Sequence, residues 1–265
     1  MPSSELSARI DAAKRAVLAQ TELFHREFGR AESRWKSDGT RVTPVDVAIS
    51  ENIFRELGAQ FAGDQFFSEE LADAPAPIPV TARFAWMLDP IDGTNNYALG
   101  MTQCAIALAL FEHGEPVYGV VYDLSRRTLM HGGPGFGVHD GERPARVRTG
   151  PFSAESLIGL HSPAEKSHVG EVQPILAHFK IRSFGSATLH LAYVAAGLID
   201  GAVDHNVKIW DLAAAIPLCR AAGGEVHFLN GEQLPLRQFD LKMKRIHYVA
   251  GSREMCARLR ELLKE

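Results

Sequence analysis

The 265-residue sequence predicts an α+β first half and an α/β second half. Two observations support this fold class. Two helical patterns are followed by short apolar segments with turn signals between them, which is typical of helices beside an antiparallel meander. Beyond residues 150–151, strand and helix patterns alternate, which favours an α/β arrangement. We therefore predict two domains, residues 1–150 and residues 151–265.

The first two helices are predicted from apolar periodicity and from capping residues. Apolar side chains recur on one face over residues 3–28, which predicts one amphipathic helix. A second helix is predicted over residues 43–61. Thr43 is a good N-cap, Pro44 suits the first turn, and Asp46 stands where a capping acid is found. Asp46 therefore has a purely structural interpretation.

The later elements follow from runs of apolar residues and from turn signals. In the first half, strands are predicted over residues 84–88, 104–111, 117–122, 128–131 and 136–139. Asp140-Gly141 is a strong hairpin signal after the last of them. In the second half, strands are predicted over residues 157–161, 181–184, 201–203 and 246–250, and helices over residues 169–179, 186–196, 212–222 and 253–263.

Composition excludes several classes of function. The net charge of −4 gives no general attraction for nucleic acid, and the basic run Arg143, Arg146 and Arg148 is interpreted as a solvated strand face. Three cysteines, far apart and odd in number, indicate reduced thiols and a cytoplasmic location. The sequence predicts no signal peptide and no membrane span.

The turn after residues 84–88 carries the strongest chemical signal. Asp89 and Asp92 lie three residues apart in a proline-stiffened turn, and two close carboxylates are costly unless a cation binds them. Hard oxygen ligands favour Mg²⁺, and the Ile91 carbonyl could be a third ligand. The N–H groups of Gly93 and Thr94 could hold a phosphate. The alternative is an ordinary Asp-rich turn with an N-cap.

Other acidic residues allow both structural and functional interpretations. Glu69 and Glu70 follow the apolar residues 66–67, which is also typical of a solvated turn after a strand. Asp211 lies near the start of an apolar helix, where an acid is usually a cap. Ser186 likewise precedes a helix, so it could simply be an N-cap.

Three sequence blocks resemble the inositol monophosphatase-like family of metal-dependent phosphatases. They are DPIDGTNNY at residues 89–97, IWDLAAAIPLCRAAGGE at 209–225 and FFSEE at 66–70. The blocks occur in the family's order, and the resemblance spans nearly the whole chain. It implies a layered αβαβα sandwich of the inositol monophosphatase and fructose-1,6-bisphosphatase type. It also implies a homodimer and sensitivity to lithium.

The resemblance assigns roles to residues of this chain. Two or three Mg²⁺ ions per site are implied, held by Glu69, Asp89, the Ile91 carbonyl, Asp92 and Asp211. The implied catalytic residues, which activate a water molecule, are Asp46, Thr94 and Glu69. The implied substrate contacts are Gly93, Thr94, Gly185, Ser186, Ala187, Asp204 and Asp211. Repulsion between carboxylates, of order 4 kcal/mol for a pair at about 4 Å, would be offset by such cations.

The predicted function is Mg²⁺-dependent hydrolysis of a small phosphorylated alcohol, with inositol monophosphate as the first choice. The alternatives are histidinol phosphate, then a nucleotide 3′-phosphate or fructose 1,6-bisphosphate. Asp204 stands where inositol monophosphatases carry a glutamate that contacts the hydroxyl groups, so the substrate stays open. Tyr97 and Ser68 are milder departures from the family's pattern. A relative that binds phosphoesters or metal without activity is the second class of function considered.

Overall fold

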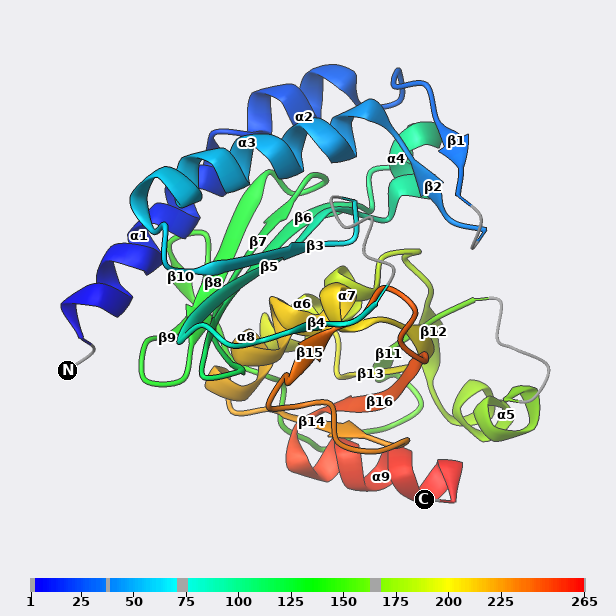
Figure 1. The fold of residues 1–265 in the computed structure, drawn as a ribbon. Coiled ribbons are helices and arrows are strands. Elements are labelled where there is room, and N and C mark those ends of the chain that lie inside the picture. Colours follow the sequence, from blue (N-terminus) through cyan, green and yellow to red (C-terminus); the bar gives the residue numbers. More distant parts are fainter. Residues whose placement is uncertain (1–2, 37–38, 71–75, 163–167, 265) are drawn as a thin grey trace.

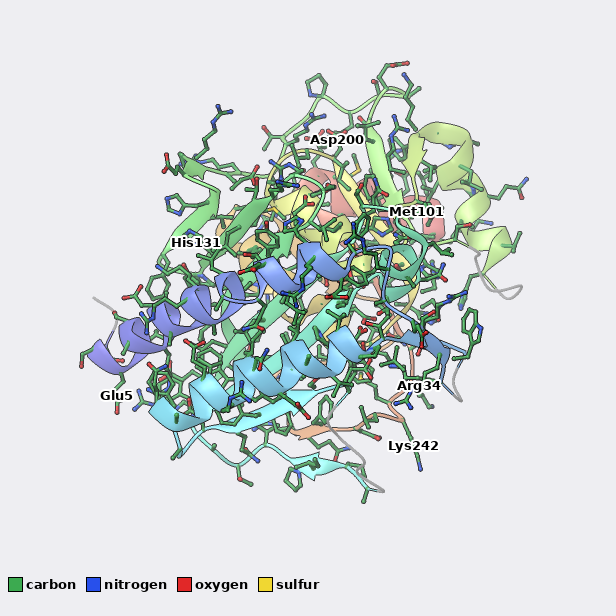
Figure 2. The ribbon with its side chains drawn as sticks, turned by 90° about the horizontal axis from the view of Figure 1, so that it is seen from above. Glu5, Arg34, Met101, His131, Asp200 and Lys242 are labelled. Carbon is green, nitrogen blue, oxygen red and sulfur yellow. The ribbon has the colours of Figure 1, made fainter. Side chains whose placement is uncertain are left out.

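The computed structural model describes residues 3–36, 39–70, 76–162 and 168–264. Helices and sheets alternate in layers, with helices outside both sheets and between them (Figure 1). The predicted layered α/β sandwich is therefore confirmed. One outer layer consists of α1 (Ser4–Leu18), α2 (Thr21–Glu27) and α3 (Pro44–Gln60). Figure 2 shows α1 and α3 lying across the strands beneath them.

The first sheet has seven strands in the order β10-β9-β8-β7-β6-β5-β3. Strand β3 is parallel to β5, and every other neighbouring pair is antiparallel, as a meander requires. The strands are β3 (Gln65–Ser68), β5 (Phe84–Asp92), β6 (Ala105–Glu112), β7 (Glu115–Asp123), β8 (Thr128–Gly133), β9 (Gly137–Asp140) and β10 (Arg143–Pro144).

Strand β5 is buried on both faces, which explains its continuous apolar sequence. Trp86 and Leu88 pack toward α1 and α3, whereas Ala85 and Met87 pack into the cluster on the other face. The strand continues through Asp92, so the prediction that it ends at Leu88 was four residues short. Pro90 does not end the strand, because a proline removes only its own N–H from the ladder of hydrogen bonds between strands.

The middle layer contains α6 (Ala187–Ala195), α7 (Ile209–Ala213) and α8 (Ala215–Ala221). It packs closely on the first sheet, since a Cβ atom at Gly119 of β7 would lie 1.8 Å from the Ala214 carbonyl oxygen. A single helix over residues 212–222 was predicted, but the helix divides near Ala214. Pro217 has no N–H to donate to the carbonyl four residues earlier, which favours this division.

The second sheet has five strands in the order β12-β11-β13-β16-β14. Strand β11 is parallel to β12 and β13, whereas β16 is antiparallel to β13 and β14. The strands are β11 (Leu157–Leu160), β12 (Lys180–Arg182), β13 (Gly201–Val207), β14 (Glu225–Phe228) and β16 (Ile246–Gly251). The far face is covered by α5 (Val169–His178) and α9 (Arg253–Leu263) (Figure 1).

Three hydrophobic clusters fill the spaces between these layers. The largest lies between the two sheets and draws residues from both halves of the chain, for example Met87 and Leu189. The two sheets come from residues 65–144 and 157–251, on either side of the predicted boundary. The division into domains 1–150 and 151–265 stays a proposal, because the halves share this core.

The predicted helix over residues 3–28 is in fact two helices. The break falls at Ala19 and Gln20, where the buried Gln20 amide donates to the Ala16 carbonyl and accepts from Asn52 of α3. Apolar periodicity continues across the break, so the sequence pattern could not reveal it. Strand β14 was not predicted, and β13 is four residues longer than predicted.

Four short strands and one short helix complete the described structure. They are β1 (Arg34–Trp35), β2 (Arg41–Val42), β4 (Ile78–Pro79), β15 (Gln238–Phe239) and α4 (Thr94–Leu99). Strand β1 pairs with β2, and β4 pairs with β15, both antiparallel. Among the described helices, none has the length and apolar character needed to cross a bilayer.

Candidate active site

A cavity of about 430 Å³ lies where strands of both sheets end. It receives Glu69 after β3, Asp89 and Asp92 from β5, and His161 after β11. The predicted site residues that line it are Glu69, Asp89, Ile91, Asp92, Gly93, Thr94, Gly185 and Asp211. Asp46, Ser186, Ala187 and Asp204 do not line it.

Three carboxylates converge in this cavity. Asp89, Asp92 and Asp211 each place one oxygen within 4.8 Å of the other two. Residues three apart in a regular strand point to opposite faces, but the pairing of β5 with β6 is irregular between Asp89 and Asp92. This irregularity lets both side chains face the same cavity, so the sequence prediction of a rigid acidic corner agrees with the observed geometry.

The three carboxylates differ in their hydrogen bonding. Asp92 Oδ2 accepts from the Ser186 hydroxyl at 2.5 Å and from the Thr188 N–H at 2.6 Å. Asp211 Oδ2 accepts from the Lys208 N–H at 2.7 Å. Asp89 Oδ1 is buried and has no hydrogen-bond partner in the described part of the chain. The cap interpretations of Ser186 and Asp211 are correct, since Ser186 Oγ also accepts from the Leu189 N–H at 3.2 Å and Asp211 accepts from the Lys208 N–H. Asp211 belongs to the three-carboxylate group as well.

Burial and mutual repulsion disfavour the charged forms of these acids. Burial, followed by the charges of Glu69 and Asp92, raises the pKa of Asp89 well above its usual value. Burial and Asp92 do the same to the pKa of Asp211. An unpartnered oxygen within a set of hard carboxylate ligands fits a divalent cation such as Mg²⁺.

Glu69 and Glu70 both pair with one lysine instead. Lys36, which follows β1, places its Nζ 3.2 Å from Glu69 Oε2 and 2.9 Å from Glu70 Oε1. Burial raises the pKa of Glu69 to about 8, against the opposing effect of Lys36. Glu69 is not part of the three-carboxylate group, so its predicted role as a metal ligand stays a prediction.

Thr94, which lines the cavity, contacts Asp46, which lies behind it. Thr94 Oγ1 lies 3.2 Å from Asp46 Oδ1 and 2.8 Å from the Ile91 carbonyl oxygen. Asp46 Oδ2 accepts from the N–H of Thr43 at 2.8 Å and from its hydroxyl at 2.6 Å, so the predicted capping box is present. Asp46 therefore caps its helix with one oxygen and meets Thr94 with the other.

The pKa of Asp46 is raised to about 6. Burial is the main cause, and the hydrogen bonds from Thr43 oppose it. A buried carboxyl group with this pKa can accept a proton near neutral pH.

Gly93 brings the two halves of the chain together at the cavity. Its φ of +84° is in the left-handed region, and a Cβ atom there would lie 2.8 Å from the Gln103 carbonyl oxygen and 3.2 Å from that of Gly185. The Asn96 amide donates to the carbonyls of Gln103 and Phe184, each at 2.7 Å, which fixes this junction.

The other end of the cavity holds residues that the sequence analysis did not single out. His161, Asn206 and Arg245 line it, and His161 Nε2 lies 3.1 Å from Asn206 Nδ2. Asp204 lies behind them, with Oδ2 buried, without a hydrogen bond among the described residues, and 3.8 Å from His161 Nδ1. The sequence feature that could have identified two of these residues is their position, since His161 directly follows β11 and Arg245 directly precedes β16.

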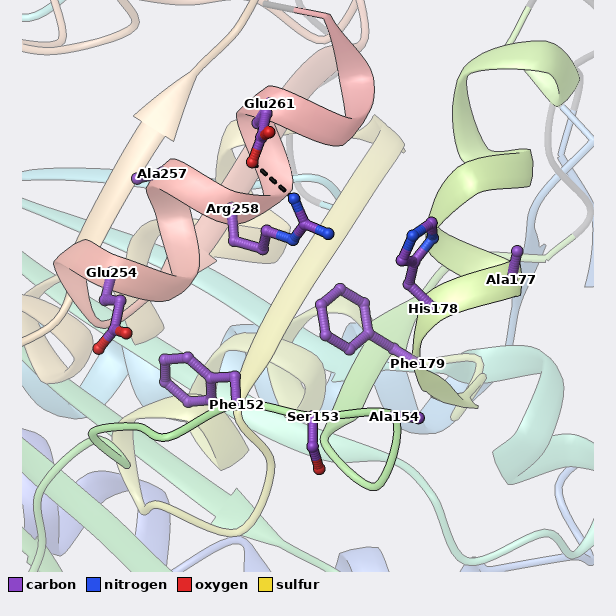
Figure 3. Close-up of a pocket in the computed structure, with 10 residues that line it drawn as sticks. All are labelled: Phe152, Ser153, Ala154, Ala177, His178, Phe179, Glu254, Ala257, Arg258 and Glu261. Atoms are coloured by element: carbon purple, nitrogen blue, oxygen red, sulfur yellow. Dashed lines mark hydrogen bonds and ion pairs between the residues drawn. The ribbon is translucent and has the colours of Figure 1, made fainter.

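A second hollow, of about 570 Å³, lies between α5, α9 and the segment before β11 (Figure 3). The rings of Phe152 and Phe179 line it, together with the ion pair between Arg258 and Glu261 at 2.6 Å. No residue that the sequence analysis selected lies there, and no group of converging carboxylates does among its described lining. The candidate active site is therefore the acidic cavity.

This fold and this site define a class of protein: a hydrolase of phosphoric monoesters. The model of the Inositol monophosphatase family matches residues 1–265, and the chain belongs to that family, whose members are metal-dependent phosphatases.

Similar proteins include two curated relatives from mycobacteria. One is named Inositol-1-monophosphatase ImpA, from Mycolicibacterium smegmatis, and is 35% identical over 215 residues, covering 76% of this chain and 75% of the relative. The other is named Histidinol-phosphatase, from Mycobacterium tuberculosis, and is 34% identical over 224 residues, covering 79% and 83%.

Among solved structures, the extragenic suppressor protein suhB of Bartonella henselae superposes with a TM-score of 0.84. It is 28% identical and the match covers 97% of this chain and 99% of that one. The sequence prediction of the family and of phosphatase activity is thus confirmed.

Proposed function

We propose that the protein is a Mg²⁺-dependent phosphomonoesterase that hydrolyses small phosphorylated alcohols, with inositol monophosphate as the first choice. The observation that supports it most is the group of three buried carboxylates with the unpartnered Asp89 oxygen. Histidinol phosphate is the second candidate, since one relative carries that name. Nucleotide 3′-phosphates and fructose 1,6-bisphosphate remain further alternatives.

Asp89, Asp92 and Asp211, with Glu69 and the Ile91 carbonyl, would hold the cations. When bound, the cations would supply Lewis-acid chemistry for the attack on phosphorus and for the departure of the alcohol. The hydrogen bonds from Ser186 and Thr188 fix the orientation of Asp92. Ser186 and its neighbour Ala187 therefore act on Asp92 in this proposal, and Gly185 supplies the cavity wall.

Thr94 and Asp46 would prepare the attacking water. The Thr94 hydroxyl, held between Asp46 and the Ile91 carbonyl, orients the water, and Asp46 accepts its proton. A pKa of about 6 allows Asp46 to be ionised at neutral pH and to accept a proton transiently. The N–H groups of Gly93 and Thr94 hold the phosphate oxygens, as the sequence motif predicts.

Phosphate release from a panel of esters tests the proposal directly. Inositol 1-phosphate, histidinol phosphate, fructose 1,6-bisphosphate and a nucleotide 3′-phosphate are each incubated with the protein, with Mg²⁺ or with EDTA. We expect release only with Mg²⁺, and faster from inositol 1-phosphate than from histidinol phosphate. Equal release in EDTA would overturn the metal dependence, and a different order of substrates would reassign the leaving group.

The remaining expectations concern the protein as a whole. We propose a homodimer in the cytoplasm, with activity that falls when lithium is added. Light scattering after size-exclusion chromatography tests the dimer, and a lithium titration of phosphate release tests the inhibition. A monomer, or activity indifferent to lithium, would correct these points and leave the site proposal intact.

A further inference from the structure

One guanidinium in the cavity has no hydrogen-bond or ion-pair partner among the described residues. Arg245 is half-buried and lines the cavity, yet its guanidinium makes no hydrogen bond or ion pair within the described chain. The side chains of Lys36 and Arg41 do have partners. Lys36 pairs with Glu69 and Glu70, and Arg41 donates to the Ser33 hydroxyl at 2.7 Å and lies over the Trp35 ring, although its buried Nε has no partner in that part of the chain.

The charge of Arg245 acts on His161 and Asp204. It lowers the pKa of His161, where burial is the larger cause, and it opposes the burial that raises the pKa of Asp204 to about 7. The charge of Asp92 acts on the same two groups. Arg245 therefore lies near the metal-site carboxylates, on the side of Asp204 and His161.

The segment that carries Arg245 is anchored and basic. The Lys208 ammonium donates to the Met243 carbonyl, and the Asp240 carboxylate accepts from the Lys242 N–H at 2.8 Å. The Asn230 amide donates to the Arg245 carbonyl at 2.7 Å. Backbone contacts thus fix the segment at both ends of its basic stretch while the guanidinium stays available.

A planar guanidinium without a partner matches a carboxylate or a phosphate through two parallel hydrogen bonds. Asp204 does not fill this role, because no ion pair joins it to Arg245 and its raised pKa leaves it partly protonated near neutral pH. A leaving group that carries its own acidic group would satisfy the guanidinium. A cationic leaving group such as histidinol would be repelled.

We propose that Arg245 recognises an acidic group on the leaving alcohol, so that the enzyme prefers phosphoesters with a second anionic group over neutral ones, and neutral ones over cationic ones. This inference rests on the proposed function, since it assumes that the phosphoryl group binds at the three carboxylates. It revises the order of substrates given there, because it places esters with a second anionic group ahead of inositol monophosphate and histidinol phosphate last. Arg245 is then a specificity-determining residue.

Matched substrates test the inference. 3-Phosphoglycerate and glycerol 3-phosphate differ only by a carboxylate in place of a hydroxymethyl group. Inositol 1,4-bisphosphate and inositol 1-phosphate differ by a second phosphate. We expect kcat/KM to be at least five-fold higher for the acidic member of each pair, with the difference mainly in KM. The pair with the larger ratio identifies which anion Arg245 accepts.

Substitutions then assign the preference to one residue. Arg245→Gln should reduce both ratios to near one, Arg245→Lys should keep part of the preference, and the exposed Arg237→Gln should change neither. Unchanged ratios in Arg245→Gln, with glycerol 3-phosphate still hydrolysed, would overturn the inference and leave the proposed function standing.

A binding measurement separates failure of the inference from failure of the proposed function. Trp35 and Trp210 line the cavity, so their fluorescence reports the Kd of 3-phosphoglycerate and of glycerol 3-phosphate in the presence of Mg²⁺. Tighter binding of 3-phosphoglycerate that is lost in Arg245→Gln supports the inference even if no ester is hydrolysed. Equal Kd values in the wild-type protein overturn it.

Discussion

Two groups of acids lie in or beside one cavity, and they differ in their hydrogen-bond and ion-pair partners. Glu69 and Glu70 share the ammonium of Lys36, which comes from the β1–β2 hairpin. Asp89, Asp92 and Asp211 have no such cation among the described residues. Asp92 and Asp211 accept hydrogen bonds from N–H and hydroxyl donors, and Asp89 Oδ1 has no donor. The first group thus has a cation that the protein supplies, whereas the carboxylates of the second repel one another until a cation binds.

The largest effect should come from removing one charge of the three-carboxylate group. Asp92→Asn keeps the size of the side chain but weakens a hard ligand, so Mg²⁺-dependent phosphate release should fall by about 10²–10³-fold or more. The fold should persist, because less repulsion is left in the cavity. Circular dichroism and a phosphate assay measure both effects.

Asp11→Asn is the matched control for that substitution. Asp11 is exposed on α1 and pairs with Lys14 at 3.0 Å. Its substitution should leave turnover unchanged. If Asp92→Asn retained turnover, the three-carboxylate group would not be the group of acids on which Mg²⁺-dependent activity depends.

The pH dependence of stability should show the cost of burying two further acids, Asp204 and Glu69. The folded-state pKa is raised to about 7 for Asp204 and to about 8 for Glu69, so these groups destabilise the fold as pH rises toward and through those values. The pKa values of half-buried His131 and buried His190 are lowered to about 4 and about 3. These histidines make the fold more stable as pH rises, but only up to the unfolded histidine pKa of about 6.5, above which their contribution is constant.

We therefore expect the metal-free protein to lose stability between about pH 6.5 and pH 8 and to change little above that, and added Mg²⁺ to reduce the loss. Urea unfolding at several pH values, with EDTA and with Mg²⁺, measures it. A metal-free stability that is flat or rises between about pH 6.5 and pH 8 would contradict the cost of burying these acids.

A smaller effect is expected from removing the internal cation. Lys36→Met frees Glu69 and Glu70 and removes a positive charge from the cavity, so Mg²⁺ should bind a few-fold more tightly. A partly exposed ion pair contributes no more than about 1 kcal/mol, which limits the gain to about five-fold. A fluorescence titration with Mg²⁺ measures this affinity.

Lys14→Met provides the comparison, because Lys14 pairs with Asp11 on an exposed helix surface. Weaker Mg²⁺ binding in Lys36→Met than in this control would show that Lys36 assists the cation instead of competing with it.

The sequence predicted those parts of the site that depend on local order. The acidic corner at residues 89–94 is encoded in six consecutive residues, and the capping box at Thr43 and Asp46 in four. The layered fold followed from the family motifs, and the buried strands followed from continuous apolar runs such as that of β5.

The parts that the sequence did not predict depend on distant contacts. Lys36, His161 and Arg245 reach the cavity from a hairpin and from two strand ends, and nothing in their local sequence marks them. The break at Gln20 depends on Asn52 of another helix. In each case a contact between distant parts of the chain determines the local structure. The apolar periodicity of the sequence cannot indicate such a contact.

The close approach at Gly93 has a consequence for genetics. Any Cβ atom at residue 93 would meet the Gln103 and Gly185 carbonyls. A larger residue would therefore push the two halves of the chain apart, whatever its effect on turnover. A saturation library at codon 93, screened only for expression with a fluorescent fusion, should return glycine almost alone. If position 93 accepts only glycine, that restriction would reflect the packing of the two halves as much as the chemistry of the site.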